Sequence, residues 1–319
     1  MLADVKARWR IVRNELANLK KTFSTPRRTE IVGPDSTAYE YSEEDFIVEE
    51  DTTVIITRGG WIKRQRSYTD LTSIRVRESD EVGWTFACAT RNTIIIWTNF
   101  GKAFTIRAND IISTTGHGEP LQKRFDFSDK ECVVGATACD KRTLPRVVYD
   151  ATNELFPLGK NGRSKEDLLG YLVACTQHGM TIRLPLDNYS ELSTRSGRLF
   201  MRLGKEDQVI GAWNAGGMEN LCVASKKAFA LIFPVRDIPF RSRAGKGVIA
   251  MRLGDGDYVL GATLSTQARE GLKVATNRGR REIVRPTKFT PVRRGNTGRQ
   301  IIRRGYLARA FIDPVEIHL

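Results

Sequence analysis

Apolar residues at the start of the chain recur in alternating steps of three and four positions. They are Leu2, Val5, Trp9, Val12, Leu16, Leu19 and Phe23. This spacing is the seam of a coiled coil, and it predicts a helix over residues 1–23 that ends before Pro26. Three heptads are marginal in isolation, so we expect this helix to pack on a partner helix that the chain does not contain.

Residues 40–51 have a different character, with seven acidic side chains and no basic one. We assign residues 24–51 as an acidic linker. An acidic strap that competes for a basic surface is the alternative interpretation.

From Thr52 onward the chain consists of short apolar runs joined in pairs by polar turns. Glycine in these turns is typical of tight β-hairpins. The fourth pair departs from the pattern, because its turn holds Lys226, Lys227 and Ala228. The five pairs read VIITRGGWIKR, IIIWTNFGKAFTIR, LVACTQHGMTIR, LCVASKKAFALI and LKVATNRGRREIV.

The segments after these hairpins repeat one another. Residues 197–204 match residues 247–254 at an offset of 50, and Gly298, Ile302 and Arg303 match again at an offset of 51. Successive units of about 40–50 residues with four strands each indicate a propeller. We therefore predict a mainly β fold: a propeller of about five four-stranded blades, preceded by the coiled-coil-type helix. The predicted repeats lie near 52–90, 91–139, 168–213, 219–264 and 270–319, with an insertion at 140–167.

Positive charge is concentrated in the repeats. The net charge is +14, whereas residues 1–51 carry 8 Lys/Arg against 11 Asp/Glu. Residues 269–309 hold 13 basic and only 2 acidic residues. This asymmetry favours a polyanionic partner, either nucleic acid or an anionic membrane. No apolar run is long enough to span a membrane.

Motifs for catalysis are missing from the sequence. Gly245-Lys246-Gly247 lacks the Ser or Thr that completes a nucleotide-binding loop, and the three histidines have no metal-site spacing. Asp255 and Asp257 recur with the repeat, which favours a role in turns. The five cysteines form no CxxC motif, and we interpret them as buried, reduced thiols rather than disulfides or zinc ligands.

Basic residues recur at equivalent places after the hairpins and in the loops that follow. Equivalent positions in a ring of blades fall on one rim, so they predict a curved basic track for duplex DNA. Phosphate contacts would offset the cost of bending that duplex. Aromatic residues are not interleaved with these positions, which disfavours single-strand stacking. The predicted DNA-binding residues are Lys63, Arg64, Arg66, Arg107, Arg183, Arg195, Arg198, Arg241, Arg243, Lys246, Arg280, Arg281, Arg293, Arg294 and Arg299. A scaffold for an acidic protein or an anionic membrane is the alternative.

Three stretches resemble a known junction. Residues 26–31 (PRRTEI), 45–51 (DFIVEED) and 54–64 (VIITRGGWIKR) are similar to the place where the coiled coil ends and the C-terminal β-pinwheel begins in the A subunit of bacterial type IIA topoisomerases. The resemblance implies that residues 52–319 form a β-pinwheel that binds and bends or wraps duplex DNA. It also implies two partners in a heterotetramer, a catalytic core and an ATPase B subunit, within the cytoplasm and at the nucleoid.

The family's nucleophilic tyrosine lies upstream of that coiled coil, so the resemblance implies a non-catalytic portion. No cofactor is expected in this chain, and ATP and Mg²⁺ would act through other domains. Gyrase A subunits carry a QRRGGKG box where this chain has residues 65–71 (QRSYTDL), and six blades where five repeats are found here. Both differences favour a topoisomerase IV-like subunit over full gyrase-type wrapping.

Overall fold

The computed structural model describes residues 4–25, 46–147 and 169–319. It divides into two compact units, Met1–Asp45 and Phe46–Leu319. Most of the predicted acidic linker, at 26–45, and most of the predicted insertion, at 148–167, lie outside the described residues. The boundaries expected for these two segments therefore remain predictions.

The first unit contains the predicted helix, α1 (Val5–Phe23). Asp4 caps its N-terminus, because the Asp4 side chain accepts hydrogen bonds from the amides of Lys6 and Ala7. The seam expected for a coiled coil is exposed, and Trp9 is 66% accessible. The helix is therefore confirmed, and its apolar seam has no partner among the described residues.

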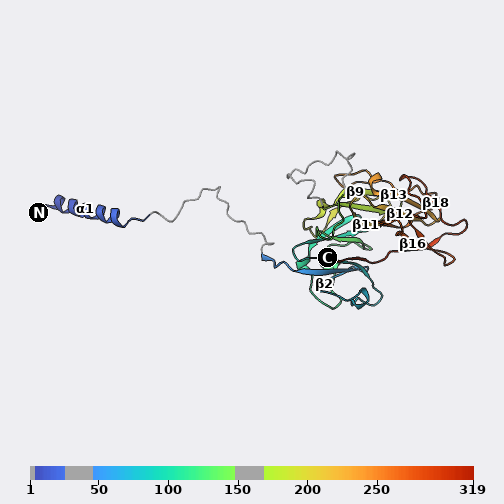
Figure 1. Ribbon diagram of the computed structural model, residues 1–319, viewed down its shortest axis with the longest axis horizontal. Coiled ribbons are helices and arrows are strands. Elements are labelled where there is room, and N and C mark those ends of the chain that lie inside the picture. Colours follow the sequence, from blue (N-terminus) through green and yellow to red (C-terminus); the bar gives the residue numbers. More distant parts are fainter. Residues whose placement is uncertain (1–3, 26–45, 148–168) are drawn as a thin grey trace. The chain divides into compact units, whose positions relative to one another are not determined.

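The second unit is built from five small β-sheets, which we call blades (Figure 1). Each contains a hairpin followed along the chain by an inner strand. The hairpins are β1 (Asp51–Thr57) with β2 (Trp61–Gln65), β4 (Thr93–Thr98) with β5 (Lys102–Arg107), β8 (Tyr171–Thr176) with β9 (Met180–Pro185), β12 (Asn220–Ser225) with β13 (Phe229–Pro234), and β16 (Leu272–Thr276) with β17 (Arg281–Val284). The inner strands are β3 (Val82–Ala89), β7 (Val133–Ala138), β11 (Val209–Ala215), β15 (Val259–Ser265) and β19 (Leu307–Phe311).

The outermost strand of a blade comes from the following repeat. Four two-residue strands pair in this way with β2, β5, β9 and β13: β6 (Glu119–Pro120), β10 (Arg198–Leu199), β14 (Val248–Ile249) and β18 (Arg299–Gln300). Sequence repeats and blades are thus offset by one strand. Each exchanged strand covers backbone groups that an edge strand would otherwise expose.

The two ends of the array differ from the middle. The first blade has five strands, because the C-terminal β20 (Val315–Ile317) pairs in parallel with β3. The fifth blade has three strands, β17, β16 and β19. The prediction of a propeller with about five blades is confirmed, while four strands per blade holds for the three central ones.

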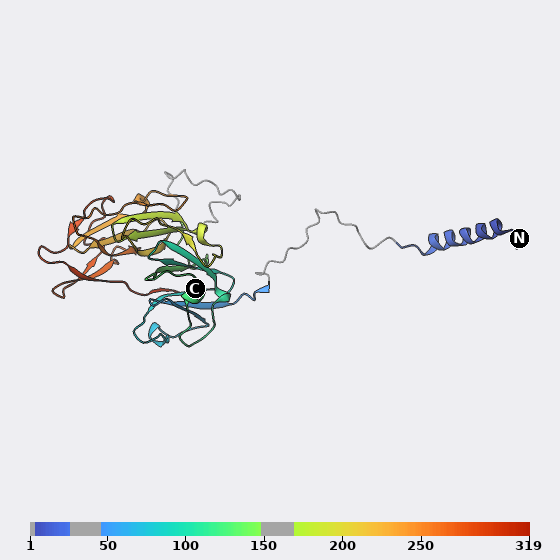
Figure 2. The ribbon, with the colours of Figure 1, turned by 180° about the vertical axis from the view of Figure 1, so that it is seen from behind.

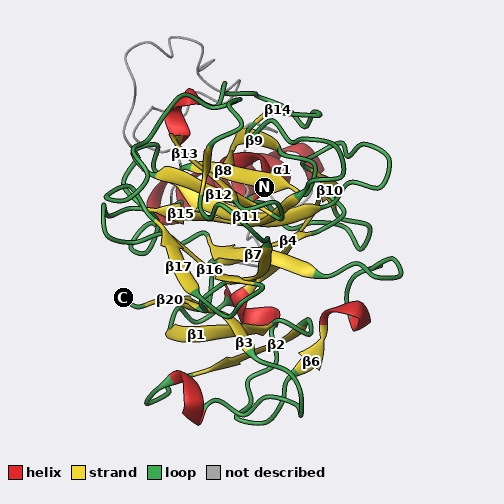
Figure 3. Cartoon of the chain, turned by 90° about the vertical axis from the view of Figure 1, so that its right-hand side faces the viewer, coloured by secondary structure: helices red, strands yellow, loops and turns green. Residues whose placement is uncertain are grey.

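Hydrophobic clusters join neighbouring blades. Residues of the first and second blades share one cluster, and three further clusters join the second to third, third to fourth and fourth to fifth blades. In the cluster that joins the second and third blades, Trp97 is fully buried and packs edge-on against Tyr189 and Phe200, with ring centroids 5.3 and 5.4 Å away. The sheets therefore pack face to face, as Figure 3 shows.

Short 3₁₀ helices connect these strands. They are η2 (Leu71–Ser73), η3 (Ala108–Asp110), η4 (Leu121–Lys123), η6 (Leu186–Tyr189) and η7 (Val235–Asp237). None of the described helices, including α1, is long and apolar enough to cross a membrane.

Candidate nucleic-acid interface

Four segments leave the hairpin of their own repeat and cross to the outer edge of the preceding blade. We call them the crossing segments, and they span residues 108–120, 186–199, 235–249 and 285–300. Their net charges, counted from Lys, Arg, Asp and Glu, are −2, 0, +3 and +5 in that order. Positive charge therefore accumulates along the array, and the predicted track is not uniform.

The third and fourth crossing segments present most of this charge to solvent. Arg241, Arg243, Lys246, Arg293 and Arg299 are all exposed. Among the described residues, none of these five side chains forms a hydrogen bond or an ion pair. Their charges are consequently available to an anionic ligand.

Other predicted cations are engaged by groups of the protein itself. Arg294 donates to the carbonyl oxygens of Asp237 (2.8 Å) and Ile249 (3.1 Å) in the third segment. Arg198 donates to carbonyl oxygens within its own segment, and Arg195 pairs with Asp126 at 3.3 Å. These residues position the surface, and their charges are partly used within the protein.

Three predicted residues are buried and do not belong to an exposed surface. Lys63 is 1% accessible, Arg107 7% and Arg183 2%. Lys63 Nζ donates to the carbonyl oxygens of Arg75 (2.8 Å) and Gly116 (2.7 Å), and burial lowers the pKa of its ammonium group. Arg183 packs over the ring of Tyr171. Because these three side chains are buried, they are not part of the candidate interface.

The remaining predictions divide between free and engaged side chains. Arg66 is exposed, whereas Arg64 is half-buried and donates to the carbonyl oxygen of Ile111 at 2.8 Å. Arg280 pairs with Glu282 at 2.7 Å, and Arg281 stacks on Phe311 with 5.6 Å between guanidinium and ring centroid. The hairpin of the fifth blade therefore offers less free charge than its sequence suggests.

Sequence reasoning missed three exposed arginines, Arg202, Arg252 and Arg303. The Arg202 amide donates to the Gly245 carbonyl in the third crossing segment (2.9 Å), and the Arg252 amide donates to the Asn296 carbonyl in the fourth (3.1 Å). These two arginines thus lie beside the two most positive segments. The repeat could have revealed all three, since they occupy the same position of the matched stretch.

Gly247 shows what the glycines of the Gly-Lys-Gly stretch do. Its φ is +78°, and a Cβ atom there would lie 2.3 Å from the carbonyl oxygen of Thr181 on β9. Glycine is required because the third crossing segment passes directly over that strand. Equivalent glycines with positive φ stand before the other exchanged strands, at Gly118, Gly197 and Gly298. A glycine is needed where this segment crosses β9, and this need explains why the stretch has a glycine-rich composition like that of a nucleotide-binding loop.

Asp257 and its counterpart Asp207 serve turns, as expected, whereas Asp255 does not recur, since Lys205 stands at its place in the preceding repeat. Asp257 Oδ1 accepts hydrogen bonds from the amides of Lys227 and Tyr258, both at 2.9 Å, and Asp207 does the same for His178 and Gln208. In the part of the chain that the structure describes, no group of three His, Cys, Asp or Glu side chains could hold a metal ion.

The cysteines are free thiols among the described residues. Cys88, Cys175 and Cys222 are buried, and burial raises the pKa of each thiol to about 12. Cys132 is exposed and Cys139 is half-buried, so the expectation that all five are buried is wrong for these two.

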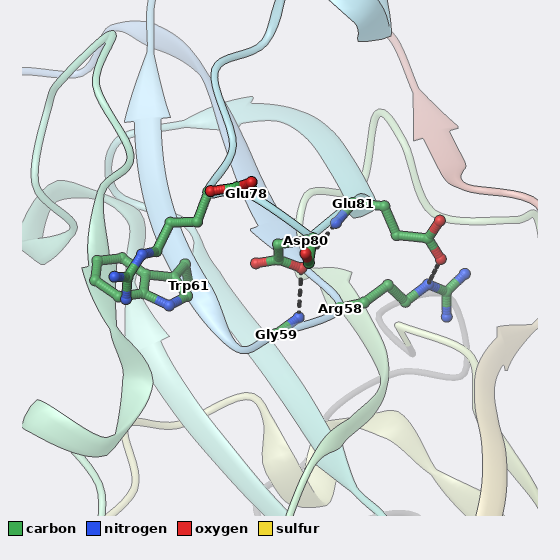
Figure 4. A pocket seen from close by; sticks show the side chains of 8 residues that line it. Arg58, Gly59, Trp61, Glu78, Asp80 and Glu81 are labelled. Carbon is green, nitrogen blue, oxygen red and sulfur yellow. Dashed lines mark hydrogen bonds and ion pairs between the residues drawn. The ribbon is translucent and has the colours of Figure 1, made fainter.

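Charged residues that line a pocket beside the first hairpin contact other residues of the same pocket (Figure 4). Arg58 pairs with Glu81 at 3.8 Å, and the Gly59 amide donates to Asp80 Oδ1 at 2.7 Å. Arg77 stacks on Trp61, with 4.6 Å between the guanidinium and the ring centroid. This pocket belongs to the blade that receives the first crossing segment, which carries no Lys or Arg, so it is not part of the positive surface.

Five blades interlocked by exchanged strands define the class of this domain as a β-pinwheel. Residues 92–140, 170–212 and 219–265 match the family model described as the DNA gyrase C-terminal domain, beta-propeller. The resemblance to the C-terminal region of type IIA topoisomerase A subunits is thereby confirmed.

Curated relatives and solved structures agree with this family. The chain is 27% identical to the DNA gyrase A protein of Dehalogenimonas lykanthroporepellens over 93% of its length, and 26% identical to that of Mycolicibacterium smegmatis over all of it. It spans about a third of each relative, 35% and 37% respectively.

The fold is that of solved C-terminal domains. A C-terminal domain of DNA topoisomerase IV has a TM-score of 0.68 at 20% identity, covering 84% of this chain and 79% of that one. A DNA gyrase A C-terminal domain has a TM-score of 0.52 at 19% identity, covering 82% of each chain.

Proposed function

We propose that residues 46–319 bind duplex DNA and bend it through the third and fourth crossing segments, without sequence specificity. The observation that carries this proposal is the accumulation of accessible, unpaired cations on those two segments. Backbone amides and arginines that contact phosphates fix a duplex in place and carry no sequence information. No recognition helix is present among the described residues of this unit, which fits binding to the DNA backbone.

The charge gradient favours bending over complete wrapping. Because the first crossing segment is negative and the second neutral, a duplex would be held along one arc of the rim. We propose that the chain acts as the C-terminal part of a topoisomerase A subunit in the bacterial cytoplasm. Such a protein would work with a catalytic core and an ATPase B subunit in a heterotetramer, and those parts would use ATP and Mg²⁺.

The test combines affinity and topology. Duplex DNA of two unrelated sequences should bind the chain with equal affinity, and the affinity should fall steeply as salt rises. Nicked circles ligated around the protein should trap little positive writhe if the duplex is bent along one arc, and substantial positive writhe if it is wrapped as by a gyrase. Absence of DNA binding at low salt, with binding to anionic vesicles or an acidic protein instead, would support the scaffold interpretation.

A further inference from the structure

The junction between the fifth and first blades is built differently from the other four junctions. At those four, an exchanged strand from one blade pairs with the outer edge of its neighbour. At the fifth blade, no strand among the described residues pairs with the outer edge of β17. Strand exchange therefore does not close the ring.

The first repeat keeps its own equivalent segment. Ile74, 6% accessible, packs with Ile55 and Val82 of the same blade. The Lys63 ammonium group binds the carbonyl oxygen of Arg75 at 2.8 Å, which fastens the segment there. The segment that could have crossed to β17 is thus folded back on the first blade.

The hydrophobic cores show the same difference. Each of the other four junctions has a shared cluster, but no cluster of the described residues combines the sheet of the fifth blade with that of the first. Further along the chain than the strands of the fifth blade, Val315 and Ile317 of β20 pack against the cluster that the first and second blades share. The fifth blade is thus joined to the first through residues 312–319, which we call the clasp.

The clasp is held by few and mostly exposed contacts. Figures 1 and 2 show the C-terminus beside the strands of the first blade. Three residues of β20 pair with β3, against two residues in each exchanged strand, so the clasp differs from the other junctions in lacking a core shared by the two sheets rather than in the length of its pairing. Arg58 donates to the carbonyl oxygens of Ile312 (3.2 Å) and Asp313 (3.4 Å), and Lys273 of the fifth blade pairs with Asp313 at 2.5 Å.

One more side-chain contact fixes the end of the clasp. The Tyr68 hydroxyl donates to Glu316 at 2.6 Å, and the Tyr68 ring stacks on His318 with centroids 6.1 Å apart. Exposed contacts of this kind contribute little each, so the clasp is the weakest of the five junctions.

We propose that the pinwheel opens at the junction of the fifth and first blades, and that release of the clasp is the opening step. Opening leaves the four interlocked junctions intact and converts a closed ring into an arc. Its consequence for DNA, a change in the path of the bound duplex, rests on the proposed function. The opening itself does not, and it is measured without DNA.

The test is the distance between spin labels on the first and fifth blades. Labels are placed at Thr72→Cys and Thr287→Cys in the full chain, with Cys132→Ser and Cys139→Ser. Deletion of residues 312–319 and the variant Arg58→Gln should both lengthen and broaden the distance distribution. The matched control is Arg294→Gln, which also removes two hydrogen bonds to carbonyl oxygens, but at an interlocked junction. It should leave the distribution unchanged.

An unchanged distribution after deletion of the clasp would overturn the proposal, as would equal broadening in the Arg294→Gln control. If the deletion variant does not fold, hydrogen exchange of the unaltered chain tests the proposal instead. The amides of Val315–Ile317 should exchange at least tenfold faster than those of β10 and β14. Equal protection would refute a clasp that opens on its own. Loss of DNA binding with normal opening would contradict the proposed function alone.

Discussion

Gly247 and Thr181 approach so closely that a Cβ atom on Gly247 would lie 2.3 Å from the Thr181 carbonyl oxygen. Here the third crossing segment passes over β9, and the next residue, Val248, pairs with Thr181. The interlock of the third and fourth blades therefore depends on the absence of a side chain at residue 247.

Gly247→Ala should destabilise the domain. The left-handed backbone alone costs roughly 1–2 kcal/mol for a residue with a Cβ, and the backbone clash adds to that cost. Gly245→Ala is the matched control, since nothing lies within 4 Å of a Cβ there and its φ is not positive. Chemical unfolding followed by circular dichroism should separate the two variants, and equal stabilities would show that the crossing tolerates a side chain.

Lys63→Met should reduce stability without changing the DNA affinity of the folded protein. The substitution leaves the carbonyl oxygens of Arg75 and Gly116 without the ammonium group that now binds them. We expect a loss of about 1–3 kcal/mol in the free energy of unfolding. Affinity is measured by fluorescence anisotropy well below the melting temperature. A drop in affinity with stability preserved would return Lys63 to the interface.

The repeats predicted the fold because each carries a complete local pattern of hairpin, crossing and inner strand. The offset of 50 between Gly197 and Gly247 made neighbouring copies recognisable. The strand exchange was not predicted, because a two-residue strand such as Val248–Ile249 has no periodicity that names its partner. Pairing with the preceding blade depends on tertiary contacts, and the local sequence indicates it only through the required glycine, Gly247.

The candidate interface was predicted only in part, for a related reason. Strand β9 is almost entirely buried on both faces, so the alternation that normally separates inward from outward positions is missing. Arg183 therefore looked like its exposed counterparts in the loops. Loop residues such as Arg241 and Arg243 were placed correctly on the surface, because the exchanged strands beside them stand at the edge of their sheets, with no further strand of the described residues paired to them.

Lowering the pH should remove the part of the fifth blade's stability that the charged form of Glu282 contributes. A hydrogen bond from Lys288 lowers the pKa of this carboxyl group below its usual 4.5, opposed by burial and aided by Arg280. A carboxylate with a lowered pKa stabilises the fold above the unfolded pKa, and this contribution is lost as the pH falls through the folded pKa.

Glu282→Gln should therefore melt at lower temperature than the parent near pH 7, and the difference should shrink below about pH 4. Melting temperatures from pH 7 to pH 3 provide the measurement. Glu206→Gln is the control, since Glu206 is exposed and has no ion pair among the described residues. A difference between parent and Glu282→Gln that stays constant with pH would contradict the role of the Glu282 charge.

Neutralising the third crossing segment should change how salt affects DNA binding. In the triple variant Arg241→Gln, Arg243→Gln, Lys246→Gln, each lost phosphate contact should reduce the slope of log affinity against log salt by about 0.9. The control removes three charges from α1 by Arg13→Gln, Lys20→Gln, Lys21→Gln. Binding isotherms at several salt concentrations measure both slopes, and melting curves verify folding. Equal slopes in the two triple variants would place the DNA contacts elsewhere, because counterion release reports only cations that neutralise phosphates.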